Sequence, residues 1–264
     1  MKKVLAILMA LMLVLCAASC GEKKSDEKDH LERIKESGKL IIAMEGNWSP
    51  WTYHDESGAL VGFDTEVAAA IAEKLGVEPE YVEGAWEGLF MGLSNGRYDV
   101  IVNGVGITDE RKDTYDFSIP YAFNTTVLIV KSDNTEITTL ADLKDKVTAN
   151  SLGSTYEALA VEAGVDHVET VDTLEETLNM VLNGRVDATL NSKGSFQDYM
   201  KAHPDAPLVI VEEVAAEYIG IPVVKGEDNA TLIEAINKAI EELRADGTLA
   251  EISTKYFGFD ITHE

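Results

Sequence analysis

The sequence predicts an α/β protein built from two lobes, each with a mostly parallel sheet flanked by helices. From Lys39 onward, short apolar runs typical of buried strands alternate with amphipathic stretches of helical period. The alternation starts again near Val147, so the chain contains two such series. Its 264 residues, 45% of them hydrophobic and 26% charged, are enough to bury a core in each lobe.

The first series predicts strands and helices in the order βαβαβ. Its first helix is capped by Asp64 and ends at Gly76. Strands that are separated by helices pair in parallel with right-handed crossovers, so this order predicts a parallel sheet. The other expected elements of this half are the strands Leu40–Ala43, Pro79–Glu83, Asp99–Val105 and Val127–Lys131 and the helix Trp86–Leu93.

The second series repeats this pattern and ends in an amphipathic helix. Ligands of open α/β sheets bind beyond the carboxyl ends of strands, which points to the segments after Ala43, Val105, Asn150 and Leu190. The expected strands are Val147–Asn150, Val168–Val171, Ala188–Leu190, Leu208–Val211 and Ile219–Val224, and the helices are Thr155–Ala163, Leu174–Asn183, Phe196–Ala202 and Thr231–Leu243.

The composition excludes several classes of function. Acidic residues outnumber basic ones 47 to 22, and a formal charge of −25 repels nucleic-acid phosphates. The two cysteines, Cys16 and Cys20, both lie near the N-terminus, which excludes a disulfide framework and a cysteine zinc site. The chain has no phosphate-loop or dinucleotide fingerprint and no nucleophile paired with a base. Its histidines are scattered singly and do not have the spacing of metal ligands. We therefore expect a binding protein without a cofactor rather than an enzyme.

The N-terminus predicts export and a lipid anchor. Lys2 and Lys3 precede the apolar run Val4–Ala18, which is too short for a membrane span and typical of a signal peptide. Ala17-Ala18-Ser19-Cys20 resembles a bacterial lipoprotein box, which makes residues 1–19 the signal peptide and Cys20 the lipid anchor. Residues 20–30 would then be a lipidated polar tether holding the protein on the extracytoplasmic face of the cell membrane. The alternative is an ordinary signal peptide that is cut near Ser19.

Several motifs, in order, resemble those of the family 3 extracellular solute-binding proteins, which serve ABC transporters of polar amino acids. The resemblance implies a type II periplasmic-binding-protein fold, in which two hinge strands join the lobes. Lobe 1 would hold residues 31–124 and 219–264, and lobe 2 residues 125–218; the protein would be a monomer whose partner is an ABC permease. The motifs are Gly62-Phe63-Asp64-Thr65-Glu66-Val67, Ile107-Thr108-Asp109-Glu110-Arg111, Asp116-Phe117-Ser118, Thr139-Leu140-Ala141-Asp142-Leu143-Lys144, Gly184-Arg185-Val186-Asp187-Ala188 and Ala245-Asp246-Gly247-Thr248-Leu249.

The resemblance also assigns roles around the α-carboxylate of an amino acid. Arg111 matches the arginine that binds this carboxylate, a task suited to a planar guanidinium; the alternative is a surface salt bridge to Asp109 or Glu110. The Gly153-Ser154-Thr155 turn matches a helix N-terminus that binds the carboxylate from the other lobe. The resemblance implies main-chain contacts from Gly104 and Gly106, and we add Asn103 as a side-chain contact.

Four further residues match positions around the ligand side chain. Trp48 and Trp86 match residues that sandwich it, and Trp51 supports them or is simply core. Glu45 matches an acid that meets the side-chain charge in relatives selecting cationic amino acids, unless it is a solvated rim residue.

One position departs from the family. Ser192 stands where an aspartate commonly receives the ligand α-ammonium. Either Glu45, Asn191 or Asn103 compensates, or the ligand is not a standard α-amino acid.

The resemblance suggests a first ligand and two competing functions. Segments such as Trp86-Glu87-Gly88-Leu89 and Ala188-Thr189-Leu190-Asn191 look most like the cystine-binding branch. Cystine is therefore the first ligand choice. The alternatives are a periplasmic prephenate or arogenate dehydratase, with Glu45 or Glu87 as its acid, and a ligand-sensing module.

Overall fold

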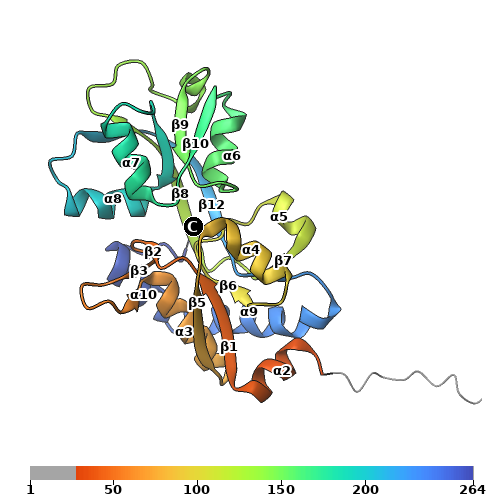
Figure 1. Ribbon diagram of the computed structural model, residues 1–264. Helices are drawn as coiled ribbons and strands as arrows, with labels where there is room; N and C mark the ends of the chain where they lie inside the picture. The colour runs from red at the N-terminus through yellow and green to blue at the C-terminus, as the bar shows by residue number, and fades with distance from the viewer. Residues whose placement is uncertain (1–27, 264) are drawn as a thin grey trace, which may run out of the picture.

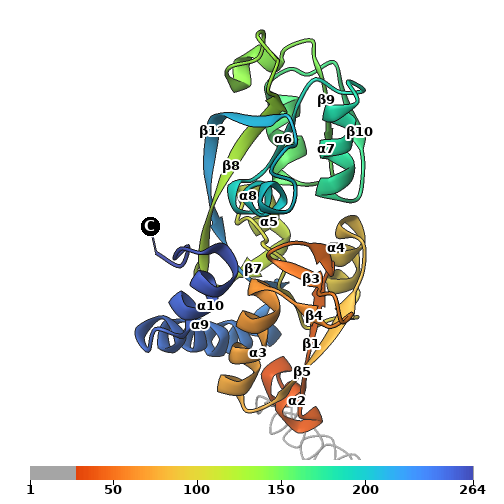
Figure 2. The same cartoon turned by 90° about the vertical axis from the view of Figure 1, so that its left-hand side faces the viewer.

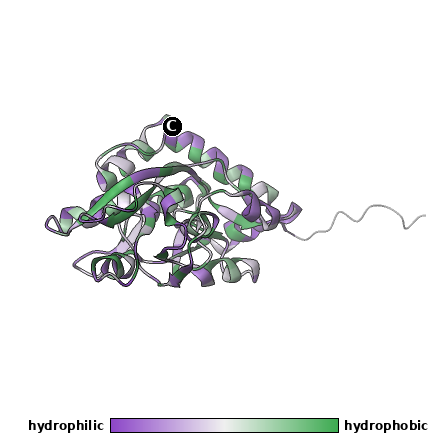
Figure 3. Ribbon diagram, turned by 90° about the horizontal axis from the view of Figure 1, so that it is seen from above, coloured by the Kyte–Doolittle hydropathy of each residue, from purple (hydrophilic) through white to green (hydrophobic). Residues whose placement is uncertain are grey.

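The computed structural model describes residues 28–263 as two lobes joined by two long strands (Figure 1). The expected signal peptide, Cys20 and most of the expected tether lie outside these residues. No helix within them is long and apolar enough to cross a membrane. Seen from above, green hydrophobic stretches run along the inner strands, and the outer helices alternate between purple and green (Figure 3).

The first lobe is built on the parallel sheet β5 (Glu78–Glu83), β1 (Lys39–Met44) and β6 (Val100–Ile101). Successive side chains of a strand point to opposite faces, so β1 serves two cores. Leu40, Ile42 and Met44 pack with α3 (Phe63–Leu75), α9 (Ala230–Ala245) and α10 (Thr248–Phe257). Ile41 and Ala43 pack with α4 (Trp86–Ser94) instead, which leaves the sheet covered on both faces.

Several short elements of this lobe escape the sequence pattern because they are only two to eight residues long. Helix α2 (His30–Ser37) begins with a capping box between Asp29 and Glu32, so ordered structure starts inside the expected tether. The others are β2 (Asn47–Trp48), β3 (Thr52–His54), β4 (Leu60–Val61), α5 (Asp109–Thr114), β7 (Tyr115–Phe117) and the 3₁₀ turn η2 (Glu227–Asn229). The strand β13 (Pro222–Val224) lies within the expected strand Ile219–Val224.

His30 ties α2 to the rest of the lobe and predicts a pH effect on stability. Its ring lies 2.7 Å from Asp99 Oδ1, and this hydrogen bond raises the pKa of His30. A raised histidine pKa stabilises the fold below the unfolded value of about 6.5, and this stability is lost as the pH rises through the folded pKa. We expect His30→Gln to cost about 1 kcal/mol at pH 5.5 and much less at pH 9. Urea unfolding at both pH values measures the difference, and an equal loss at both would contradict it.

Asp64 does not cap α3 as expected but is the second residue of the helix, within its first turn, and is buried. The helix begins at Phe63 after Gly62, whose φ of 134° and tight contact exclude a side chain: a Cβ would lie 2.3 Å from the Trp51 carbonyl oxygen. Asp64 instead accepts the main-chain N–H of Gly104 at 2.6 Å and the Tyr121 hydroxyl at 2.7 Å. The acid of the helix motif therefore fixes a loop at the lobe's edge, and burial raises its pKa to about 7.

The second lobe pairs β9 (Val147–Asn150) with β10 (His167–Thr170) in parallel, but its larger sheet is antiparallel. There β11 (Thr189–Ser192) and β12 (Leu208–Ile219) flank β8 (Ala122–Lys131). Val127 and Ile129 face one core, and Leu128 and Val130 face the other. These cores lie under α6 (Thr155–Glu162), α7 (Leu174–Leu182), α8 (Lys193–Ala202) and the 3₁₀ turn η1 (Leu140–Leu143).

Strands β8 and β12 run side by side from one lobe to the other (Figure 2). Two strands, Leu208–Val211 and Ile219–Val224, were expected here, and their bounds are wrong: β12 continues from Leu208 to Ile219, and the second strand, β13, begins only at Pro222. Acidic residues and two bulges interrupt its apolar pattern in the middle, between Ile210 and Ala215. The interruption reflects bulges and partly exposed positions in a continuous strand of the second lobe's sheet rather than a loop.

Candidate ligand-binding site

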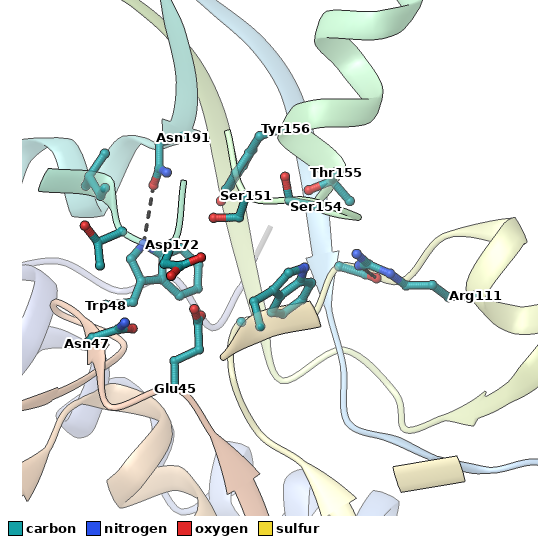
Figure 4. Close-up of a pocket in the computed structure, with 15 residues that line it drawn as sticks. Glu45, Asn47, Trp48, Arg111, Ser151, Ser154, Thr155, Tyr156, Asp172 and Asn191 are labelled. Atoms are coloured by element: carbon teal, nitrogen blue, oxygen red, sulfur yellow. Dashed lines mark hydrogen bonds between the residues drawn. The ribbon is translucent and has the colours of Figure 1, made fainter. Parts of the chain in front are cut away.

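A pocket lies between the lobes and encloses about 520 Å³ of empty space, its open mouth included (Figure 4). Both lobes contribute side chains, and most of the expected residues line it: Glu45, Trp48, Trp86, Gly104, Gly106, Arg111, Ser154 and Thr155. Trp51, Asn103 and Ser192 do not line it but lie behind it, each fully buried. The sequence therefore predicts which residues gather at the pocket, but not which of them are buried behind its wall.

Arg111 spans the gap between the lobes. Its Nη1 donates to the carbonyl of Gly106 in the first lobe at 2.8 Å, and its Nη2 donates to the carbonyl of Gly153 in the second at 3.1 Å. The guanidinium lies 5.3 Å from the Trp86 ring centroid, and burial lowers its pKa. It makes no salt bridge to Asp109, which pairs with Lys112, or to Glu110. Its flat faces and fixed donors suit a carboxylate.

The N-terminus of α6 meets the pocket from the second lobe. Ser154 caps it by accepting the N–H of Glu157 at 3.0 Å, and the positive end of the helix dipole faces the space near Arg111. Thr155 donates its hydroxyl to Glu217 of β12 at 2.5 Å. Glu217, which the sequence analysis did not single out, also accepts Nδ2 of Asn124 at 2.8 Å, so it fixes α6 against both crossing strands.

The two glycines allow the main chain to approach the aromatic wall. Gly104 has a φ of 55°, and a Cβ there would lie 2.5 Å from Cζ3 of Trp48. Its N–H is already held by Asp64, and the carbonyl of Gly106 by Arg111. Gly104 can therefore offer its carbonyl, but not its N–H, to a ligand.

The three tryptophans have different environments. Trp48 lines the pocket and stacks on Trp51, with ring centroids 5.3 Å apart and planes 14° apart. Trp51 is fully buried, so of its two expected roles the structure favours core and support for Trp48. Trp86 has one edge on the pocket and is 8% exposed, with its body packed among Leu89, Ile101 and neighbours.

Glu45 is held at the pocket by Asn103. The main-chain N–H of Glu45 donates to Asn103 Oδ1 at 2.8 Å, and Asn103 Nδ2 returns a bond to Glu45 Oε2 at 2.6 Å. Burial raises the pKa of Glu45 to about 7, and the negative charges of Glu87 and Asp172 act in the same direction. Glu45 is thus not a solvated rim residue.

This raised pKa predicts that Glu45→Gln stabilises the ligand-free protein at high pH. A carboxyl group whose pKa is higher in the folded than in the unfolded protein lowers the free energy of unfolding as the pH rises. This loss of stability is absent below the unfolded pKa of 4.5 and complete above about pH 7. Glutamine keeps an acceptor for Asn103 without the charge, so we expect a gain of about 1–2 kcal/mol at pH 8 and none at pH 4. Thermal or urea unfolding at both pH values checks it, with Glu56→Gln, an exposed residue of the β3–β4 loop, as the control.

Ser192 cannot take the place of the missing aspartate at the pocket wall, because its hydroxyl is used elsewhere. It donates to Asn124 Oδ1 at 2.8 Å and caps α8 by accepting the N–H of Ser195 at 3.4 Å. Trp51 Nε1, from the other lobe, also lies 3.4 Å away. Its neighbour Asn191 lines the pocket and accepts Nε1 of Trp48 at 3.3 Å, a further contact between the lobes (Figure 4).

Asp172 is the most important residue that the sequence analysis missed. It follows β10, whose carboxyl end lies beside that of β9, yet the segment after β10 was not among those singled out. The rule that ligands bind at carboxyl ends of parallel strands could have found it. The other missed lining residues are Asn47, Ser151, Tyr156, Thr173 and Leu174.

The charges of the lining are uneven. Arg111 is the one cation among the described residues that line the pocket, against the two carboxylates of Glu45 and Asp172. No group of three metal-binding side chains occurs within residues 28–263. The charges of the lining complement a molecule that carries both a carboxylate and a positive charge.

Comparisons with known proteins identify the family of the chain. The model of "Bacterial extracellular solute-binding proteins, family 3" matches residues 40–259. The L-cystine-binding protein TcyA of Bacillus subtilis is 37% identical, covering 99% of this chain and 100% of its own.

Two solved structures share the fold. An ancestral arginine-binding protein bound to arginine is 41% identical, with a TM-score of 0.78 over 84% of this chain and 99% of its own. An ancestral amino acid-binding protein, a precursor of cyclohexadienyl dehydratase, is 31% identical, with a TM-score of 0.78 over 86% of this chain and 99% of its own. With a family model over most of its length and a relative matched end to end, this chain belongs to the family 3 bacterial extracellular solute-binding proteins.

Proposed function

We propose that the protein captures a polar amino acid outside the cytoplasm and delivers it to an ABC permease by hinge closure. The observation that carries this proposal is Arg111, which lies between the lobes and donates to a carbonyl of each. A ligand carboxylate on this guanidinium would also meet the N-terminus of α6, so one group would tie the lobes together. The hinge would be where β8 and β12 cross, with lobe boundaries near residues 124–125 and 218–219.

Cystine is our first choice of ligand, because a relative matched over nearly the whole chain is an L-cystine-binding protein. The test is a thermal-shift screen of the mature domain against the amino acids and cystine, followed by calorimetry. A ligand at a hundred times its dissociation constant raises stability by about 2.7 kcal/mol. Absence of any shift, in protein that unfolds cooperatively, would overturn the proposal.

A dehydratase is the competing function, since a structural relative is a precursor of such an enzyme and the raised pKa of Glu45 suits a proton donor. We favour binding without catalysis because the carboxylate of Glu45 is held by Asn103 and faces other negative charges. Incubation with prephenate and arogenate, followed by detection of the aromatic products, distinguishes the two functions.

The lipid anchor on Cys20 is a further part of the proposal, and it predicts where a variant will be found. Cys20→Ser removes the sulfur that would carry the lipid, and no helix within residues 28–263 is long and apolar enough to cross a membrane. We expect the variant in the soluble extracytoplasmic fraction and the unmodified protein in the membrane fraction. Recovery of both from the membrane pellet would exclude anchoring through Cys20.

A further inference from the structure

The main-chain segment 104–107, which forms part of the pocket wall, is attached to one of the crossing strands. The carbonyl of Val105 accepts the N–H of Gly220, directly after β12, at 3.0 Å. The N–H of Ile107 donates to the carbonyl of Tyr218, near the end of β12, at 2.8 Å. The later part of this segment is therefore fixed to β12 by main-chain hydrogen bonds.

Gly104, the first residue of the segment, is held by Asp64 instead. Oδ2 of Asp64 accepts the N–H of Gly104 at 2.6 Å. Oδ1 accepts the hydroxyl of Tyr121, the residue before β8, at 2.7 Å. Asp64 is fully buried, so both hydrogen bonds are shielded from water. One carboxylate thus connects helix α3, the pocket wall and the start of the other crossing strand.

The position of Gly104 affects the pocket in two ways. Its carbonyl is the main-chain group that it can offer to a ligand, because Asp64 takes its N–H. It also packs against the two stacked tryptophans: a Cβ would lie 2.5 Å from Cζ3 of Trp48 and 3.4 Å from Cδ2 of Trp51. In such close packing, a shift of Gly104 would redirect the carbonyl and displace the aromatic wall together.

We propose that Asp64 is a positioning residue of the ligand site, which fixes the Gly104 carbonyl and the Trp48 wall relative to the crossing strands. This deepens the proposed function and rests on it. Asp64 does not line the pocket, so it acts through the main chain of Gly104. Without its acceptor, the buried N–H of Gly104 would have no partner, and the segment would have to move to satisfy it.

Two substitutions of Asp64 distinguish this role from a general contribution to stability. Asp64→Asn keeps an oxygen for the N–H of Gly104, and its amide can donate to the hydroxyl oxygen of Tyr121. Asp64→Leu has the same branched shape but no acceptor. We expect Asp64→Asn to stay within about threefold of the wild-type dissociation constant, and Asp64→Leu to bind about tenfold or more weakly. Calorimetry with L-cystine and with L-arginine as probes measures both.

Ile71→Ala is the matched control for lost stability. Ile71 is buried in the same helix, two turns beyond Asp64, in the core that α3 shares with β1. Its truncation lowers the melting temperature by leaving a cavity. We expect the folded variant to keep the wild-type dissociation constant. A loss of affinity in Asp64→Leu that neither Asp64→Asn nor Ile71→Ala shows would assign the effect to the missing acceptor.

The amide proton of Gly104 reports the same contact by NMR without a ligand. Its short hydrogen bond to a carboxylate should place the resonance far downfield. Burial raises the pKa of Asp64 to about 7, so the resonance should move as the pH passes through this value. In Asp64→Asn the resonance should not titrate.

The titration is recorded in Glu45→Gln protein. The pKa of Glu45 is also raised to about 7, and its carboxylate is held by Asn103, the neighbour of Gly104. Tyr121 is the other titratable group in contact with Asp64, and burial raises its pKa well above the ordinary value, so its hydroxyl stays protonated. In this background the titration of Gly104 near pH 7 belongs to Asp64.

Four results would overturn the positioning role. In the first, Asp64→Leu binds as tightly as Asp64→Asn. In the second, Asp64→Leu and Ile71→Ala lose equal affinity. In the third, the Gly104 resonance does not titrate in Glu45→Gln protein, which decides the question even if Asp64→Leu fails to fold. These three leave the proposed function intact if an amino acid binds. In the fourth, no amino acid of the thermal-shift screen binds to wild-type protein, which removes the proposed function and this role together.

Discussion

Trp51→Ala is expected to destabilise the protein by about 3–5 kcal/mol, the usual cost of removing a buried tryptophan. The ring is fully buried and packs edge-on against Phe63 and Phe257, with centroids 5.6 and 5.1 Å away. Truncation would leave a cavity at the centre of the first lobe's core. Urea unfolding of the ligand-free protein measures the loss.

The same substitution should also weaken ligand binding, because Trp48 stacks on Trp51 and forms part of the pocket wall. Trp51→Phe is the matched variant: it keeps an aromatic core and a stacking surface but loses the N–H near Ser192. We expect it to recover most of the stability. If Trp51→Ala were as stable toward urea as the wild-type protein, the interpretation of Trp51 as a core residue would be wrong.

The regular α/β elements could be predicted because their signal is local. The apolar run of β1 fills two cores with alternate side chains, and α3 ends at Gly76, whose φ of 77° is the left-handed conformation that favours glycine. Arg111 and Glu45 line the pocket as expected: Arg111 ends the motif Ile107–Arg111, and Glu45 follows β1, at whose carboxyl end a ligand was expected.

The remaining features depend on contacts between distant segments. Asp64 has the sequence of a helix cap, but its partners Gly104 and Tyr121 are 40 and 57 residues away. Ser192 was expected to contact the ligand, but in the folded second lobe its hydroxyl donates to Asn124 instead. No local pattern contains this information, since the lobes meet only after folding.

Arg111→Lys is expected to weaken binding of the amino-acid ligand by about 2–3 kcal/mol, or roughly 30- to 150-fold in dissociation constant, without unfolding the protein. The substitution keeps the positive charge, so the electrostatic attraction of the ligand from solution is preserved. What it removes is the planar fork. A lysine nitrogen is a single centre and cannot donate to Gly106, Gly153 and both oxygens of a carboxylate at once.

Arg97→Lys is the control, because Arg97 is exposed on the same lobe and lies over Tyr98, away from the pocket. Calorimetry on both variants separates the geometry of the site from a general effect of replacing arginine. An unchanged dissociation constant in folded Arg111→Lys would mean that the carboxylate binds elsewhere, with the N-terminus of α6 as the remaining anchor. A loss in Arg111→Lys alone would mean that one guanidinium, donating to a carbonyl of each lobe, holds the ligand at the boundary where closure takes place.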